Sequence, residues 1–399
     1  MKLFGLILLF LAMAAPAWAG RKITVSQLEE MMRSMQRDKK SDSESANALK
    51  QVELSEQLTR DKMSELLTLT GGPLSTEQIY VLEASSASLV PPASEVPSTP
   101  APDATAQKSM LMKAETYVER NYSQLPVFTA TRTTLRFQDN VEAVASSSGV
   151  AGSARDVVTG SSFSNPASFI HYINSSEARI AFEHGAEKLP QEEDKTPWGA
   201  NRMIALLSPD PNLATVFRTA QQSGTLQWQR WELVNGKPAG VFSFSVPRKL
   251  SKLDLKVCCF PNINQTGVAN FYTATTANTL GPAGATGGGV SGNYQTNTEW
   301  HDFKTIAPYH GEFFIDPDSG IVVRMITEAE MKPSEVVHQV DTRIDYGPVK
   351  LGASMVVAPV RTYVNTVVVP GGDSQAGTYT TRCTLFTSVF KDYQTGGAK

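Results

Sequence analysis

The stretch 311-GEFFIDPDSGIVVRM-325 places a short acidic segment, closed by a glycine, between two apolar runs. Pro317 suits the second position of a tight turn, and Gly320 can adopt the positive φ that closes one. The flanking runs are typical of antiparallel strands. We therefore predict a β-hairpin centred on Asp318. The predicted cross-strand pairs are Ile315 with Ile321, Phe313 with Val323, and Glu312 with Arg324.

The same acidic segment raises a second interpretation, a calcium loop. An EF-hand loop needs a glycine at its sixth position and a glutamate at its twelfth. Counted from Asp316, Gly320 comes one residue too early and Thr327 takes the twelfth position. The turn accounts for every residue of the segment, so no metal site is predicted here, and no cofactor is predicted for the chain.

The fold class is predicted from the amino-acid pattern after Val127. Short segments rich in β-branched and aromatic residues recur there, with few predicted helices between them. Asn235-Gly236 between two such segments is a strong hairpin signal. About ten strands in this arrangement predict a mainly β (α+β) fold. The expected architecture is an antiparallel meander forming an unclosed barrel around one or two helices, preceded by a small helical region.

Composition divides the chain of 399 residues into regions. Residues 1–19 combine Lys2, an apolar run and the small residues of Ala17-Trp18-Ala19, which is typical of a signal peptide, so the mature chain is expected in the periplasm or outside the cell. Residues 20–89 show helical periodicity, and the five prolines of 90–105 predict a linker. Residues 106–399 form the predicted β domain. Its insertions are a helical segment near 199–222, interpreted as two short helices broken at Pro209, and a glycine-rich loop at 280–298.

Charge and hydropathy limit the classes of partner that the protein is expected to bind. The net charge is −3 and the sequence pI is about 6.0, so no surplus of cations exists to neutralise phosphates, and nucleic acid is not an expected partner. No segment after the signal peptide is apolar enough to span a membrane.

Three cysteines fit an exported protein that does not depend on many disulfides. Cys259 shares an apolar strand face with Val257. A bridge from the adjacent pair Cys258-Cys259 to Cys383 is therefore expected, with Cys259 as the candidate, and leaves one thiol.

Few residues offer catalytic chemistry. His338 falls on the apolar side of an alternating strand, which favours a buried structural histidine, and His310 and Glu312 share a strand face without a defined third ligand. The sequence lacks the motifs of common hydrolases and dinucleotide enzymes. A hydrolase built from His310, Glu312 or His338 therefore stays a minor hypothesis. Trp228 and Trp231 either fill the core or line a cleft for a lipid or glycan.

One resemblance rests on "YHGEFFIDPDSGIVVRM", "VDTRIDYGPVKLGASMVVAPVRTYV" and "FKDY". These segments resemble a group of uncharacterised secreted bacterial proteins and, more distantly, the periplasmic lipoprotein-carrier and outer-membrane lipoprotein-sorting proteins. The resemblance implies an unclosed β-barrel around helices, with an apolar concavity that holds acyl chains.

Two main functional hypotheses follow. In the first, the protein is not an enzyme and binds an apolar ligand, such as a lipid, an acyl chain or a lipoprotein segment, in the half-barrel. The residues expected to line that cavity are Phe242, Phe244, Phe313, Ile315 and Val323. In the second, an envelope scaffold protein docks a partner through its N-terminal helices.

Overall fold

The computed structural model describes residues 21–139, 170–188, 205–206, 208–261, 300–332, 334–368 and 382–396. The predicted signal peptide and the glycine-rich loop at 280–298 lie outside the described residues.

A ten-stranded sheet forms most of the molecule, and all of its strand pairs are antiparallel. The strands run in the order β5-β4-β3-β15-β14-β13-β12-β11-β8-β7, and the edge strands β5 and β7 do not pair with each other. The predicted mainly β fold with an unclosed antiparallel sheet is confirmed. The strands are β3 (Phe128–Asp139), β4 (Ile170–Glu183), β5 (Ala186–Lys188), β7 (Gln227–Val234), β8 (Lys237–Val246), β11 (Tyr309–Ile315), β12 (Val322–Ala329), β13 (Val337–Leu351), β14 (Ser354–Val368) and β15 (Arg382–Thr395).

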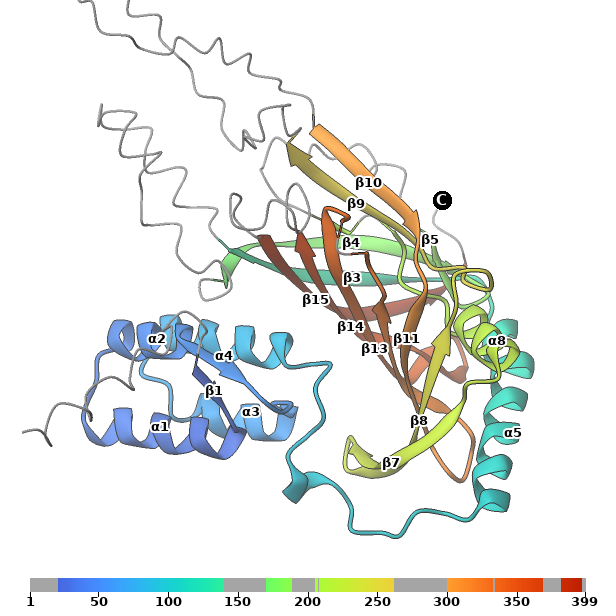
Figure 1. Cartoon of the computed structure of the whole chain (residues 1–399), viewed down its shortest axis with the longest axis horizontal. Helices are drawn as coiled ribbons and strands as arrows, with labels where there is room; N and C mark the ends of the chain where they lie inside the picture. Colours follow the sequence, from blue (N-terminus) through green and yellow to red (C-terminus); the bar gives the residue numbers. More distant parts are fainter. Residues whose placement is uncertain are drawn as a thin grey trace, which may run out of the picture.

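Two helices, α5 (Ala104–Arg120) and α8 (Leu213–Ser223), pack on one face of this sheet, which we call the inner face (Figure 1). On α5 the buried residues Met110, Ala114 and Val118 follow each other at intervals of four, so they form one stripe against the sheet. Together with Phe217 of α8 and the inward side chains of the strands, they make up the main hydrophobic core.

The hairpin of β11 and β12 has the predicted turn. The amide of Gly320 donates to the carbonyl of Asp316 at 2.9 Å, and Gly320 has a φ of +75°. The Asp316 carboxylate accepts hydrogen bonds from the amides of Asp318 and Ser319 and from the Ser319 hydroxyl. The Asp316 carboxylate therefore stabilises the turn in which it lies.

The predicted register of this hairpin is wrong. Phe314 lies opposite Arg324 whereas Ile315 lies opposite Val322, so Val323 is the extra residue of a β-bulge. The observed pairs are Phe313 with Met325, Glu312 with Ile326, and Ile315 with Val322. A bulge changes which side chains share a face, and pairing rules applied to a regular hairpin do not anticipate it.

A second, three-stranded sheet contains β6 (Ala205–Leu206), β9 (Asp254–Pro261) and β10 (Trp300–Ile306). The predicted helical segment near 199–222 is therefore only partly helical. Residues 205–206 pair with β9 as a strand, and α8 is the helix that follows the prolines at 209 and 211. Residues 199–204 lie outside the described part of the chain.

The N-terminal unit comprises helices α1 (Val25–Arg37), α2 (Asp42–Lys50), α3 (Arg60–Leu67) and α4 (Pro73–Ser85), with a parallel pair of strands, β1 (Arg21–Ile23) and β2 (Val52–Leu54). It has its own core around Leu28, Leu66 and Ile79. Another side of α4 packs against Phe137 and Tyr363 on the face of the large sheet opposite α5, which we call the outer face.

An extended segment with one 3-10 turn (Ala93–Glu95) then leads from α4 to α5 (Figure 1). None of the helices in the described ranges is long and apolar enough to cross a membrane.

Candidate functional site

The predicted lining residues of the half-barrel lie in a packed core. Phe242, Phe244, Phe313 and Ile315 are all buried on the inner face. The Phe313 ring stacks on Phe244 at 4.4 Å and contacts Phe217 of α8 at 5.1 Å, measured between ring centroids. The helix of the protein itself therefore fills the space beside these four residues.

Val323 does not join this group. Because it is the bulge residue of β12, it packs with Val241, Phe314 and Ile326 on the outer face. Its assignment to the inner lining is wrong for the same reason as the hairpin register.

The expected disulfide between Cys259 and Cys383 is also wrong. Cys383 carries a buried thiol on β15, opposite Val367 of β14, whereas Cys258 on β9 takes part in a disulfide. The strands β9 and β15 belong to different sheets, which the alternation of residues along one strand does not reveal.

The residues of the hydrolase hypothesis have separate partners. His310 lies 3.3 Å from Glu328 and 3.5 Å from Glu330, and the hydrogen bond with Glu328 raises the pKa of His310. Glu312 instead forms a two-pronged ion pair with Arg230. His338 is half-buried at a bulge of β13. Within the described ranges, no group of three His, Cys, Asp or Glu side chains is arranged to hold a metal ion.

Trp228 and Trp231 belong to the edge strand β7 and pack against the main hydrophobic core. Trp228 contacts Trp231 and Phe242 edge to face, at 4.9 and 5.4 Å between centroids. The indole N–H of Trp231 donates to the carbonyl of Pro100 at 2.9 Å, so this aromatic pair also holds the segment that leads to α5.

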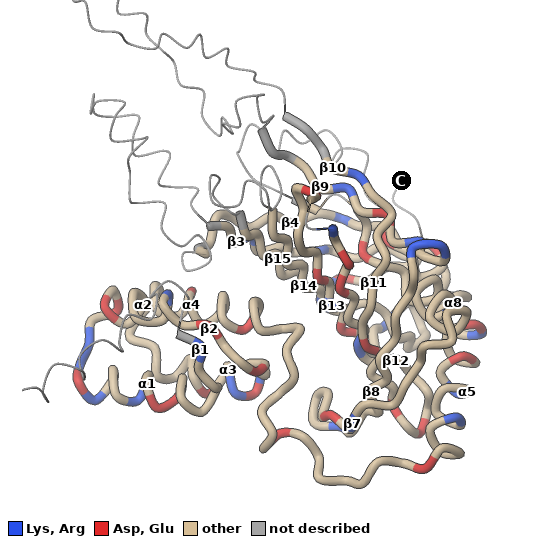
Figure 2. The backbone as a smooth tube through the Cα atoms, in the orientation of Figure 1, with Lys and Arg blue, Asp and Glu red and all other residues tan. Residues whose placement is uncertain are grey.

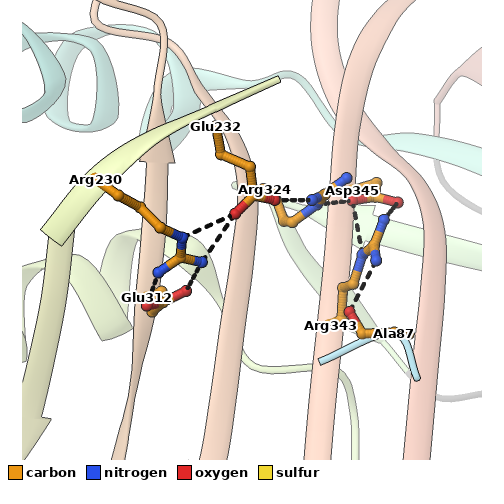
Figure 3. A network of polar contacts seen from close by, with 7 residues as sticks. All are labelled: Ala87, Arg230, Glu232, Glu312, Arg324, Arg343 and Asp345. Atoms are coloured by element: carbon orange, nitrogen blue, oxygen red, sulfur yellow. Dashed lines mark hydrogen bonds and ion pairs between the residues drawn. The ribbon is translucent and has the colours of Figure 1, made fainter. Parts of the chain in front are cut away.

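Charged residues gather near the middle of the large sheet (Figure 2), and on its outer face they form a continuous network (Figure 3). From Glu312 it passes through Arg230, Glu232, Arg324, Asp345 and Arg343, and ends at the carbonyl of Ala87 just after α4. The distances of the successive contacts are 2.7 Å for Arg230–Glu312, 2.8 Å for Arg230–Glu232, 3.2 Å for Arg324–Glu232, 2.7 Å for Arg324–Asp345, 3.0 Å for Arg343–Asp345 and 2.8 Å from Arg343 to the Ala87 carbonyl.

Two features stabilise this network although most of it is buried. Burial opposes the ionisation of Asp345, but Arg343 and Arg324 more than offset that effect and hold the pKa of Asp345 below its usual range. The Arg324 guanidinium also lies 5.0 Å from the centre of the Phe314 ring, a cation–π contact. The network therefore ties the N-terminal unit to the outer face of the sheet.

The inner face carries a second buried polar group near β5. Arg132 of β3 forms an ion pair with Glu187 of β5, and Asp210 lies beside Glu187. Burial, together with the neighbouring charge of Glu187, raises the pKa of Asp210 to about 8. The two neighbouring carboxyl groups therefore oppose each other's ionisation, and Arg132 provides the opposite charge.

A groove of about 1090 Å³ runs along the side of α5 that does not face the core. We call it the α5 groove. One side of α5 lines it together with residues 121, 122 and 124–126, the hairpin turn at Ser319 and Ile321, and the β13–β14 hairpin at 348 and 355–357. Its volume is slightly above the usual range for small-molecule sites, about 300–1,000 Å³.

The hairpin turn forms one wall of this groove because it packs directly on α5. A Cβ atom added to Gly320 would lie 2.5 Å from the Lys113 main-chain carbon, and the Lys113 ammonium donates to the carbonyl of Pro317 at 2.9 Å. The sequence identified this turn, but not its contact with a helix some 200 residues earlier.

Apolar side chains are exposed along the α5 groove. Met112 of α5 is 58% exposed and Met355 of β14 is 65% exposed. Tyr117, Val356 and Val357 line the same groove and are half-buried. An accessible apolar strip next to a wall of the barrel is a surface that a flexible hydrocarbon can cover.

The comparisons with known proteins add little. No protein family and no curated protein matches the chain. Among solved structures, one described as the complex structure of Pseudomonas aeruginosa MucA/MucB matches 74% of this chain and 100% of that chain, at 8% sequence identity and a TM-score of 0.20. That score is too low to carry an argument about fold or function, and the resemblance to the lipoprotein carriers stays a prediction.

Proposed function

We propose that this protein is an exported, non-enzymatic binding protein that holds an acyl chain in the α5 groove. The observation that carries the proposal is the exposure of Met112, on α5, and Met355, on β14, both of which line a groove of about 1090 Å³. Methionine side chains are flexible and polarisable, so they adapt to the irregular surface of a hydrocarbon chain.

The location differs from the one expected from the sequence. Because α8 and its Phe217 occupy the space beside Phe313, the chain binds next to α5 at the side of the half-barrel rather than within it. The ligand class, an apolar chain bound by an unclosed barrel, is unchanged.

The test uses monolaurin, an uncharged twelve-carbon amphiphile, in calorimetric titrations below its aggregation concentration. Wild-type protein should bind it, and the double variant Met112→Glu, Met355→Glu should lose that binding. Both positions are exposed, so the variant should fold normally. Leu74→Glu, at a residue of α4 that is 49% exposed and outside the groove, is the matched control and should bind like wild type. An absence of binding to wild-type protein, or equal binding by all three proteins, would refute the proposal.

A second candidate, a docking module for an envelope partner, is favoured by one observation. Leu74 and Tyr80 on α4 are 49% and 39% exposed although the helix is otherwise well packed. Cross-linking in the native envelope followed by mass spectrometry tests it. A single partner whose cross-link is lost in Leu74→Glu, Tyr80→Glu and kept in Met112→Glu, Met355→Glu would favour docking over chain binding.

A further inference from the structure

The charged residues that line the α5 groove are all positive. Its lining includes Lys108, Lys113 and Arg120 of α5 and contains no Asp or Glu. All three cations are exposed. Within the described part of the chain none of them forms an ion pair, and Lys113 donates only to the Pro317 carbonyl.

The nearest acidic residues in the sequence lie outside the lining of the groove. Glu115 and Glu119 belong to α5 and Asp318 belongs to the hairpin turn, and none of the three lines the groove. The Asp316 carboxylate of the neighbouring turn is engaged by the turn's own amides and by the Ser319 hydroxyl. The groove therefore presents positive charge beside an apolar strip.

Lys108 and Arg120 mark the two ends of this charged side. At about 1.5 Å per residue they are roughly 18 Å apart along the helix axis, with Met112 and Tyr117 between them. An extended hydrocarbon can follow the apolar strip between the two ends while an anionic headgroup reaches one cation. Arginine and lysine both bind carboxylate and phosphate groups through charge-assisted hydrogen bonds.

We infer that the α5 groove selects an anionic single-chain amphiphile, in which one of the cations Lys108, Lys113 and Arg120 binds the headgroup and the apolar strip binds the chain. The inference rests on the proposed acyl-chain function and adds the class of headgroup. An uncharged chain satisfies the apolar strip alone, and a cationic chain is repelled by three unpaired cations.

The experiment compares three ligands with the same twelve-carbon chain: laurate, monolaurin and dodecyltrimethylammonium. Each exposed ion pair is worth up to about fivefold in affinity. With one such pair, laurate should therefore bind about two- to fivefold more tightly than monolaurin, and dodecyltrimethylammonium should bind more weakly than monolaurin. Raising the salt concentration from 0.05 to 0.5 M should reduce the preference for laurate and leave monolaurin unchanged.

The charge-reversed variant Lys108→Glu, Arg120→Glu should invert the order, so that the cationic ligand binds more tightly than laurate. The matched control Arg218→Glu, Lys249→Glu makes the same change of net charge at exposed residues that do not line the groove, and should keep the order of the wild type. The single variants Lys108→Glu and Arg120→Glu show which end of the groove receives the headgroup.

The outcomes separate the two proposals. Equal affinity of wild-type protein for all three ligands refutes the headgroup inference but supports chain binding. Binding of none of them refutes chain binding itself. Two further results would also overturn the inference, because each would place the anionic headgroup outside the groove. One is a preference for laurate that persists in the charge-reversed variant, and the other is a preference that is lost equally in the control Arg218→Glu, Lys249→Glu.

Discussion

Gly320→Ala is the substitution that most directly tests the contact between the hairpin turn and α5. Gly320 has a φ of +75°, a conformation in which an added Cβ costs about 1–2 kcal/mol. The new Cβ would also lie 2.5 Å from the main-chain carbon and Cβ of Lys113 and 2.7 Å from its carbonyl oxygen. Overpacking against a main chain that cannot rotate away costs a further ~1–3 kcal/mol.

We therefore expect Gly320→Ala to lower the free energy of unfolding by about 2–5 kcal/mol. The measurement is urea unfolding followed by tryptophan fluorescence. Gly236→Ala is the matched control, because Gly236 has a φ of +73° in the β7–β8 turn but nothing lies within 4 Å of its added Cβ. The control carries the backbone strain alone and should cost about 1–2 kcal/mol.

The difference between the two variants isolates the contact with α5. If both lose the same free energy of unfolding, the turn does not pack on the helix in solution, and one wall of the α5 groove would not exist. A larger loss in Gly236→Ala than in Gly320→Ala would also contradict the reasoning.

Three further predictions concern the interior. Asp345→Ala leaves Arg324 and Arg343 buried without their shared carboxylate, so it should lower the free energy of unfolding in urea by about 3–5 kcal/mol. A decrease below about 1 kcal/mol would mean that water reaches the network. Phe313→Ala removes a fully buried ring and should cost about 3–5 kcal/mol by the same assay, and near-neutral behaviour would show that the core beside α8 is not packed. The raised pKa of Asp210, about 8 in the folded chain against 3.8 as its ordinary value, means that the folded state binds this proton more tightly than the unfolded state. The stability that this protonated carboxyl contributes is therefore complete below about pH 4 and is lost as the pH rises to 8. In urea unfolding across this pH range, the wild type should lose more free energy of unfolding than Asp210→Asn. Parallel pH profiles of the two proteins would contradict the raised pKa of Asp210.

Local sequence rules predicted the features that depend on neighbouring residues. The turn at Asp316–Gly320 and the hairpin at Asn235-Gly236 form where their proline, asparagine and glycine residues predict them. The open antiparallel sheet followed from the repeated short β segments. These features arise from backbone preferences over a few residues, which a single sequence contains.

The features that were missed depend on contacts between distant segments. The bulge at Val323 changes the hairpin register without a local signal, because valine suits a regular strand equally well. Arg343 reaches the carbonyl of Ala87, which is 256 residues away in the sequence. Arg343 lies on the outer face of β13, and it is buried there because α4 packs on that face.

The candidate site shows the same division. The sequence identified an apolar face with Phe313 and Ile315, and that face exists. Whether such a face binds a ligand or packs against a helix depends on the position of α8. The periodicity of apolar residues in the sequence does not predict that position. The α5 groove combines residues near 110–126 with residues near 319–357, and its charge is visible only after these segments are brought together.

The strand order has a consequence for how the chain reaches its native state. The first strand of the large sheet, β3, pairs with the last, β15, and the hydroxyls of Thr134 and Ser388 lie 2.9 Å apart although 254 residues separate them. Until β15 has paired with both of its neighbours, β3 and β14 each have an unpaired edge, so the ten-stranded sheet is incomplete. Pairing across such sequence distances makes folding slow. Loss of β15, a strand of fourteen residues, would separate β5-β4-β3 from the other six strands of the sheet.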